Sequence, residues 1–283
     1  MARPAGRLSI FAGTGDMVPH AVDAALTAGY KVQVLSLVPR PDLTAVKVIP
    51  VDVGNPLAII WSLKIFRTTH ITMAGAIHLP DKAREGLIKF AAGNGQSSSA
   101  GDSRPIGDAA FAALGSVLKK MTGADLVGVQ EIAPDLLASE GHIAGPLVPA
   151  ETMASARFAL ETARAIGALD IGQAAVVSGQ RVIAVEDIGG TDALIARVGE
   201  LKRQGLAGDG TMPLILAKAL KPQQPEFADL PAIGPATIEN CAAAGIAFIA
   251  VHAGNSVVIE RTQLLDAADR LGIGVIGLVP GDG

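Results

Sequence analysis

The sequence predicts an α/β protein, with an N-terminal Rossmann-like parallel-sheet domain followed by a C-terminal mixed α/β domain. Three observations predict this class. Short β-branched runs alternate with helical segments through the first half of the chain, as in βαβ units. Hydrophobic residues make up 49% of the 283 residues but aromatic residues only 3%, so the core must be aliphatic, which suits buried parallel strands. The Pro- and Gly-rich segment 133–149 interrupts the alternation, and we place the boundary inside it, giving domains 1–138 and 139–283.

The elements of the first half are predicted from apolar patterns that end at Gly or Pro. Pro19 and Pro56 each stand in the first turn of a predicted helix, where a missing N–H does no harm. The patterns predict strands over 8–12, 31–37, 70–74 and 126–129, and helices over 18–28, 55–67 and 107–120.

The second half is predicted to contain a β-hairpin, at 174–185 around Ser178-Gly179-Gln180. The segment 256–260 is predicted to be the hairpin partner of a strand at 246–251. The remaining predicted elements are helices over 150–167, 191–204, 237–244 and 264–271, and strands over 214–219 and 275–279.

Composition and charge exclude several classes of protein. With 23 Lys+Arg against 27 Asp+Glu the net charge is −4, which gives no basic field, so we expect no nucleic-acid partner. The single Cys241 excludes a disulfide framework and is expected to be a small core residue. The five His residues lack metal-binding spacing. No P-loop and no GxSxG nucleophile elbow occurs in the sequence.

Apolar segments bear on the location of the protein. The run at 8–11 is too short for the core of a signal peptide, and the longest uncharged stretch, 241–259, is broken by Gly and polar residues. We therefore expect a cytoplasmic protein. The predicted helix at 57–67 is apolar on most faces, so it is either buried or lies on the inner membrane, with Trp61 at the interface and Lys64 and Arg67 toward lipid phosphates. The sequence leaves this peripheral contact, and a homodimer, open.

A glycine-rich turn follows the first predicted strand. Gly13, Thr14 and Gly15 precede a predicted helix, and such a turn lets the backbone approach a phosphate at the helix N-terminus. The dinucleotide fingerprint requires a third glycine where this chain has Val18-Pro19, and an acidic residue where it has Leu37-Val38-Pro39-Arg40. Both differences argue against NAD. The turn is either a nucleotide or phosphate contact or a purely structural feature.

A second turn of this kind follows the predicted strand at 70–74. Ala74 and Gly75 end this strand, and ligands of α/β sheets gather at the carboxyl ends of the strands. The alternative is a tight turn without a ligand.

The segment 186–192 places three carboxylates around a glycine pair. Gly189, Gly190 and Thr191 stand at the start of a predicted helix, and Asp187 and Asp192 flank them. Backbone N–H groups there suit an anion, and the carboxylates suit Mg²⁺ beside a phosphate. An ordinary acidic helix cap is the alternative.

Two lysines and an aspartate follow the predicted strand at 214–219. Lys218 and Lys221-Pro222 come before Asp229-Leu230-Pro231, a set that suits a diphosphate with a metal ion. A pair of solvated lysines is the alternative.

The chain resembles the LpxI family of Mg²⁺-dependent UDP-2,3-diacylglucosamine pyrophosphatases of lipid A biosynthesis. The resemblance covers almost the whole chain and is strongest from Gly107 onward. Its motifs are 12–15 with Pro19, 73–75, Ala165-Ile-Gly-Ala-Leu-Asp-Ile-Gly-Gln173, 186–192, Lys221-Pro222, Asp229-Leu230-Pro231, Gly234 and Thr237. The chain departs from the family pattern in a longer, Ser-rich loop at 93–103, and in Ala76 where a second glycine is common.

The resemblance implies two domains with the substrate between them, and hydrolysis of UDP-2,3-diacylglucosamine to UMP and 2,3-diacylglucosamine 1-phosphate (lipid X). Asp229 matches the family's essential aspartate. We expect Asp229 to be the catalytic residue and a metal ligand together with Asp187 and Asp192, with Mg²⁺ as cofactor and Mn²⁺ as its substitute.

The residues expected to bind substrate are those of the glycine turns and the two lysines, which neutralise diphosphate charge: Gly13, Thr14, Gly15, Ala74, Gly75, Gly189, Gly190, Thr191, Lys218 and Lys221. A nucleotide-dependent oxidoreductase and a non-catalytic binder of nucleotide or acylated sugar are the alternative functions.

Overall fold

The structure is a computed structural model that describes residues 6–75, 77, 85–86, 89, 107–208, 210–222 and 230–281. The chain divides into two compact units after Pro134. The first unit contains a parallel sheet and the second a mixed sheet, and helices alternate with the strands in both. This α/β architecture confirms the predicted fold class.

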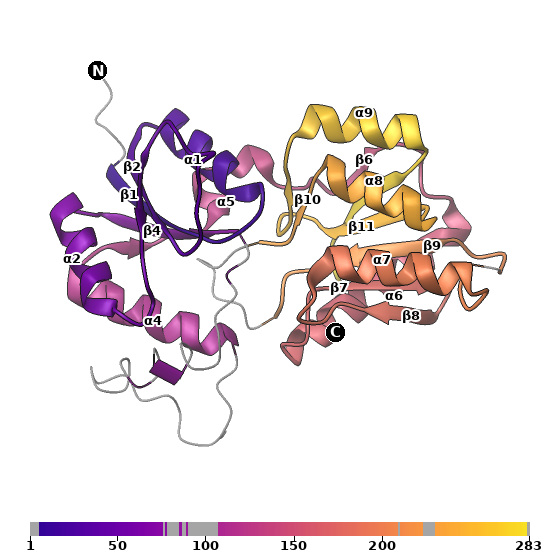
Figure 1. Cartoon of the computed structure of the whole chain (residues 1–283). Helices are drawn as coiled ribbons and strands as arrows, with labels where there is room; N and C mark the ends of the chain where they lie inside the picture. The colour runs from indigo at the N-terminus through magenta and orange to yellow at the C-terminus, as the bar shows by residue number, and fades with distance from the viewer. Residues whose placement is uncertain are drawn as a thin grey trace. The chain divides into compact units, whose positions relative to one another are not determined.

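The first unit is built on a five-stranded parallel sheet of order β3-β2-β1-β4-β5, of which β1, β2 and β4 are labelled in Figure 1. Leu35, Ile71 and Met73 of the sheet pack against Ile59 and Leu63 of a neighbouring helix. The elements are β1 (Gly6–Ala12), α1 (Met17–Thr27), β2 (Tyr30–Ser36), β3 (Lys47–Pro50), α2 (Pro56–Phe66), β4 (His70–Ala74), α4 (Gly107–Thr122), β5 (Asp125–Leu126) and α5 (Val129–Ile132).

The second unit is built on a six-stranded mixed sheet of order β6-β13-β11-β9-β7-β8. Three of its strands, β9, β11 and β13, are parallel neighbours, whereas β6, β7 and β8 pair antiparallel. The elements are β6 (Gly141–Ala144), α6 (Ala150–Ala168), β7 (Ala174–Ser178), β8 (Arg181–Val185), α7 (Gly190–Arg203), β9 (Leu214–Lys218), β10 (Ala232–Ile233), α8 (Pro235–Ala244), β11 (Phe248–His252), β12 (Val257–Val258), α9 (Arg261–Leu271) and β13 (Gly274–Leu278).

Helices cover both faces of the second sheet (Figure 1). Leu214 and Leu216 of β9 pack in the cluster that contains α7, α8 and α9, while Ile215 and Ala217 pack in the cluster that contains α6. Side chains of a strand alternate between faces, so a continuous apolar run is what a strand covered on both sides requires. Cys241 lies in the first of these clusters and is fully buried, as predicted.

Several sequence-based assignments need correction. The segment 256–260 is not the hairpin partner of β11, because β12 pairs in parallel with β10 in a separate two-stranded sheet. The strand predicted at 126–129 is limited to Asp125–Leu126, and Val129 begins a short helix. Strands β3 and β6 were missed, since both are only four residues long.

Among the helices of the described ranges, none has the length and apolar character needed to cross a bilayer.

Candidate functional site

The two glycine turns of the first unit lie against each other at the carboxyl edge of the parallel sheet. Strands β1 and β4 are paired so that Ala12 stands beside Ala74, and the N–H of Gly13 donates to the carbonyl of Ala74 at 3.0 Å. Gly75 has φ +79°, and a Cβ atom there would stand 2.3 Å from the carbonyl oxygen of Thr14. A residue with a side chain therefore fits neither the backbone conformation nor the space.

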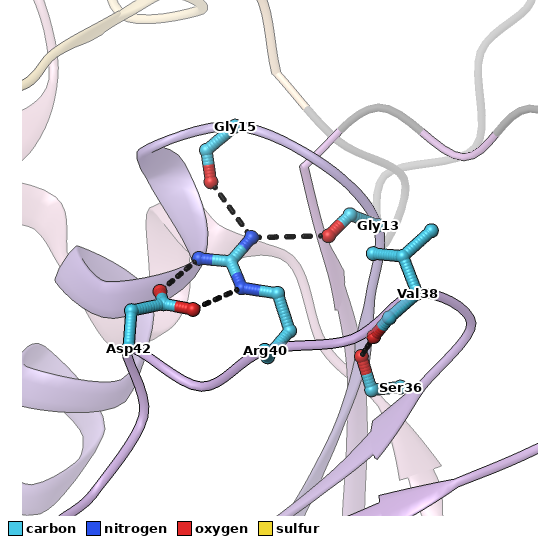
Figure 2. Close-up of polar contacts among 6 residues, drawn as sticks. All are labelled: Gly13, Gly15, Ser36, Val38, Arg40 and Asp42. Atoms are coloured by element: carbon cyan, nitrogen blue, oxygen red, sulfur yellow. Dashed lines mark hydrogen bonds and ion pairs between the residues drawn. The ribbon is translucent and has the colours of Figure 1, made fainter.

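Arg40 fixes the first of these turns (Figure 2). Its guanidinium donates to the carbonyl oxygens of Gly13 and Gly15, at 3.1 and 2.9 Å, and forms a two-point ion pair with Asp42, at 3.0 and 2.6 Å. The Arg40 side chain is only 8% exposed. Its hydrogen bonds hold the pKa of the Asp42 carboxyl below the ordinary value.

The orientation of the turn follows from these contacts. The peptide bonds are trans, so each N–H points away from the carbonyl of the preceding residue. With the Gly13 and Gly15 carbonyls directed at Arg40, the N–H groups of Thr14 and Asp16 face the opposite side of the turn. The N–H of Asp16, which lies beside the N-terminus of α1, is therefore the donor of this turn that suits an anionic group.

An apolar hollow of about 520 Å³ lies beside Arg40, where β2 and β3 end. Its lining consists of 36–41, Val48, Pro50 and Val51. Sequence reasoning missed Arg40 as a structural residue, although a single cation between Pro39 and Pro41 was a visible signal.

In the second unit, the predicted acidic segment lies between β8 and α7, and its carboxylates have protein partners. Glu186, 6% exposed, accepts hydrogen bonds from the N–H of Gln173 at 2.6 Å and from the Thr191 hydroxyl at 2.7 Å. Asp187 accepts from the N–H of Gly189, which precedes Gly190 at the start of α7, at 2.8 Å. Asp192 accepts from the Asn240 amide at 3.1 Å.

Among the described residues, no three His, Cys, Asp or Glu side chains lie close enough together to hold a metal ion. Asp229 lies outside the described residues. The metal set of Asp187, Asp192 and Asp229 therefore stays a prediction.

The two predicted lysines are anchored, not solvated. Lys218 ends β9, is 7% exposed, and donates to the carbonyl of Ala232 at 2.9 Å. Lys221 forms an ion pair with Asp170 at 2.6 Å, with side chains 19% and 17% exposed. Asp170 has φ +55°, a left-handed conformation that an aspartate adopts more readily than most residues. Lys218 thus ties β9 to β10, the element that follows the segment containing Asp229.

His252 is a further polar residue at the edge of the sheet where Lys218 lies. Lys218 of β9 pairs with Val251 of β11, and His252 is the next residue of β11. Its Nε2 is 3.2 Å from the Asn255 amide nitrogen. Asn255 is therefore a hydrogen-bond partner of the imidazole. Burial lowers the pKa of His252, the positive charge of Arg164 lowers it further, and Glu161 opposes both. No sequence pattern indicated this residue, because the contact arises between α6 and β11.

Comparisons with known proteins match both units. The LpxI N-terminal domain matches residues 7–136 and the LpxI C-terminal domain matches residues 139–276. A UDP-2,3-diacylglucosamine pyrophosphatase, LpxI, of Caulobacter vibrioides is 43% identical over 160 residues, which cover 56% of this chain and 56% of the relative. The match thus spans little more than half the length of that relative.

Two solved structures were also found to be similar. The UDP-glucose 4-epimerase of Thermus thermophilus, in complex with NAD, has a TM-score of 0.33 and 16% identity, over 98% of this chain and 88% of that chain. A GalE-like L-threonine dehydrogenase from Cupriavidus necator has a TM-score of 0.30 and 10% identity, over 94% and 92%. Likeness at these scores carries no argument about fold or ligands. The two domain matches, which together span nearly the whole chain, show that the protein belongs to the LpxI family.

Proposed function

We propose that the protein hydrolyses the diphosphate bond of UDP-2,3-diacylglucosamine, giving UMP and lipid X in lipid A biosynthesis. The observation that carries this proposal is the match of both LpxI domains across residues 7–276, apart from 137–138. The name of the Caulobacter vibrioides relative supplies the substrate. That relative is matched over 56% of its length, so the activity is transferred as a proposal.

In the proposed reaction, water attacks one phosphorus of the diphosphate, the bridging P–O bond breaks, and the proton of the water is released to a base or to solvent. Such a reaction depends on positioning and on neutralising the developing charge. The oriented turn at Gly13, Thr14 and Gly15, packed on Ala74 and Gly75, supports a role in binding an anionic part of the substrate. The remaining proposed substrate contacts are Gly189, Gly190, Thr191, Lys218 and Lys221.

The two lysines support charge neutralisation in different ways. Lys218 is nearly buried, where a positive charge interacts more strongly than in water. Lys221 is held by Asp170, so its charge is partly compensated before any substrate binds. We therefore expect Lys218 to contribute more to diphosphate binding than Lys221.

Mg²⁺, with Mn²⁺ as substitute, is proposed as the cofactor. A hard divalent cation would polarise the diphosphate oxygens when bound. Asp187 and Asp192 each use one carboxylate oxygen in a hydrogen bond within the protein, and Asp229 is needed to complete a set of three. Hydrolysis is expected to stop in EDTA and to return on addition of Mg²⁺. Full activity after exhaustive chelation would exclude the metal, and would leave the hydrolysis itself standing.

The alternative functions are separated by two further assays. Pro19, which has no N–H, and Arg40, which stands where a dinucleotide fold carries an acidic residue, argue against NAD binding. A fluorescence titration with NADH should therefore show no binding. A non-catalytic binder would retain the intact substrate, and mass spectrometry of lipids and nucleotides that co-purify with the protein would reveal it.

Asp229→Ala is expected to lower kcat by about 100-fold or more while KM stays unchanged or falls. Pro231 keeps Leu230 extended, so Asp229 adjoins a stiff segment suited to orienting water or a metal. Removing a negative charge should not weaken the binding of a diphosphate. A purely structural Asp229 would instead cost about 1 kcal/mol of stability and leave kcat within a few-fold, so kcat and Tm are measured on the same preparation.

A further inference from the structure

We propose that helix α2 binds the surface of an anionic lipid bilayer, lying in the plane of the headgroups. Helix α2, Pro56–Phe66, carries three large apolar side chains in solvent: Leu57 is 60% exposed, Trp61 67% and Ile65 73%. They are spaced four residues apart, so they form one stripe along the helix. The inference rests on this exposure and on charge, and does not require the proposed hydrolysis.

The opposite face of α2 already supplies the core. Ile59, Ile60 and Leu63 are 1%, 5% and 0% exposed and pack in the core of the first unit. The helix is therefore held firmly without the outer stripe. Burying three large apolar side chains in a bilayer interface is favourable, whereas their exposure to water does not stabilise the folded unit.

Charge selects a lipid surface as the occupant. Lys64 borders the stripe, Arg67 ends the helix, and both are exposed. Helix α2 contains no acidic residue. In the described part of the chain, neither cation forms an ion pair with a carboxylate. Two unpaired cations beside an apolar stripe complement anionic headgroups, and Trp is the residue type favoured at that depth.

The length of α2 fits this placement. Eleven residues span about 16 Å, which is about half of a hydrocarbon core. The helix therefore lies on the membrane instead of crossing it, with the Lys64 stem along the apolar surface and its ammonium toward the phosphates. A diacylated substrate, which resides in such a membrane, would be consistent with this contact.

Trp61 makes the test specific, because it is the single tryptophan of the chain. The full chain is titrated with vesicles of phosphatidylcholine alone and of phosphatidylcholine mixed with phosphatidylglycerol, without substrate. We expect a blue shift of Trp61 emission and co-sedimentation with the anionic vesicles, and loss of both at high salt, because salt screens exposed charges. Unchanged emission together with no co-sedimentation would overturn the proposal.

Two matched pairs of variants separate the charge from the apolar stripe. Lys64→Gln with Arg67→Gln should weaken the vesicle partition constant by about 30-fold, since each cation near an anionic surface contributes about 1 kcal/mol. Lys31→Gln with Lys47→Gln, two exposed lysines of β2 and β3, should leave it unchanged. Leu57→Ser with Ile65→Ser should also release the protein, and Leu147→Ser, which removes an exposed leucine (72%) of the second unit, should not.

A second copy of this chain is the competing occupant of the stripe. In that case Trp61 emission would shift with protein concentration in the absence of vesicles, and light scattering would report a dimer that Leu57→Ser with Ile65→Ser dissociates. That result would overturn the proposal. Turnover is measured separately in detergent micelles, so failure to bind vesicles and failure to hydrolyse the substrate are distinguishable.

Discussion

Arg40 illustrates how one side chain can organise a backbone turn. Its guanidinium joins two carbonyls of the Gly13–Gly15 turn to Asp42 in the segment after β2. The planar fork of donors makes these contacts simultaneously, which the ammonium group of lysine cannot reproduce. The orientation of the turn thus depends on a residue 25 positions further along the chain from Gly15.

Arg40→Ala is expected to lower the free energy of unfolding by about 1–3 kcal/mol, because hydrogen bonds from a largely buried charged group are lost. Affinity for nucleotide should fall in parallel, and Arg40→Lys should recover little of either. Urea denaturation and a binding titration measure the two effects.

Arg203→Ala is the control for Arg40→Ala. Arg203 is 71% exposed and pairs with Glu200, so its loss should change stability by less than about 0.5 kcal/mol. Equal effects of the two changes would exclude the role given to Arg40.

Gly75 allows a comparison that isolates the close approach of the two turns. Gly75 and Gly29 have φ +79° and +86°, but a Cβ at Gly75 meets the Thr14 carbonyl at 2.3 Å while one at Gly29 meets nothing within 4 Å. Gly29→Ala should cost about 1–2 kcal/mol from backbone conformation alone. Gly75→Ala should cost at least about 1 kcal/mol more, from overpacking, and should lower catalytic efficiency. Identical melting temperatures for the two variants would show that the turns are not in contact.

At the scale of elements, the carboxyl ends of the parallel strands in the second unit hold Lys218 and His252, from β9 and β11. Helix α6 packs across β11 and brings Arg164 and Glu161 into the surroundings of His252. The packing of these two elements thus lowers the pKa of His252, because the ring is partly withdrawn from water and lies near a cation.

This environment gives stability a defined pH dependence. The pKa of His252 in the folded protein lies below its ordinary value of 6.5, so the unfolded chain takes up a proton at a higher pH than the folded chain. The contribution of His252 to the free energy of unfolding is fully present above about pH 6.5, and it is lost as the pH falls through the pKa of His252 in the folded protein. His252→Asn should therefore flatten the dependence of unfolding free energy between about pH 7 and pH 5. His142→Asn, at an exposed position, is the control and should leave the dependence as steep as in the wild type.

The elements that local patterns determine were predictable. Asn55-Pro56 begins α2, and the Asn55 side chain caps it by accepting from the N–H of Ala58, as the sequence signal requires. The hairpin of β7 and β8 was also correct. The pairing of β12 with β10 was not predictable, because it joins segments 25 residues apart, Ala232 and Val257, that have two strand residues each.

The candidate site was likewise only partly predictable from the sequence. Glycine turns at strand ends are visible in the sequence, and parallel pairing of β1 with β4 makes them neighbours. The partners that hold the site residues are not visible, because each contact crosses a long stretch of chain: Arg40 to Gly13 across 27 positions, and Lys221 to Asp170 across 51. The grouping of Asp229 with Asp187 and Asp192 stays a prediction, because it requires segments about 40 positions apart in the sequence to meet.

At the scale of the whole molecule, two units with separate sheets and separate cores make up the chain. The two LpxI domain matches divide the chain between residues 136 and 139, within the Pro- and Gly-rich segment where the sequence alone suggests a boundary. Family membership thus concerns both units, and the proposed hydrolysis is to be tested on the full chain.

The most direct test of the central proposal is a product analysis of the full chain with UDP-2,3-diacylglucosamine in detergent micelles and Mg²⁺. Mass spectrometry of quenched samples measures substrate, UMP and lipid X over time, with the Caulobacter vibrioides relative assayed in parallel. We predict that UMP and lipid X form in equal amounts as the substrate disappears. An intact substrate in a reaction where the relative forms both products would contradict the proposed function.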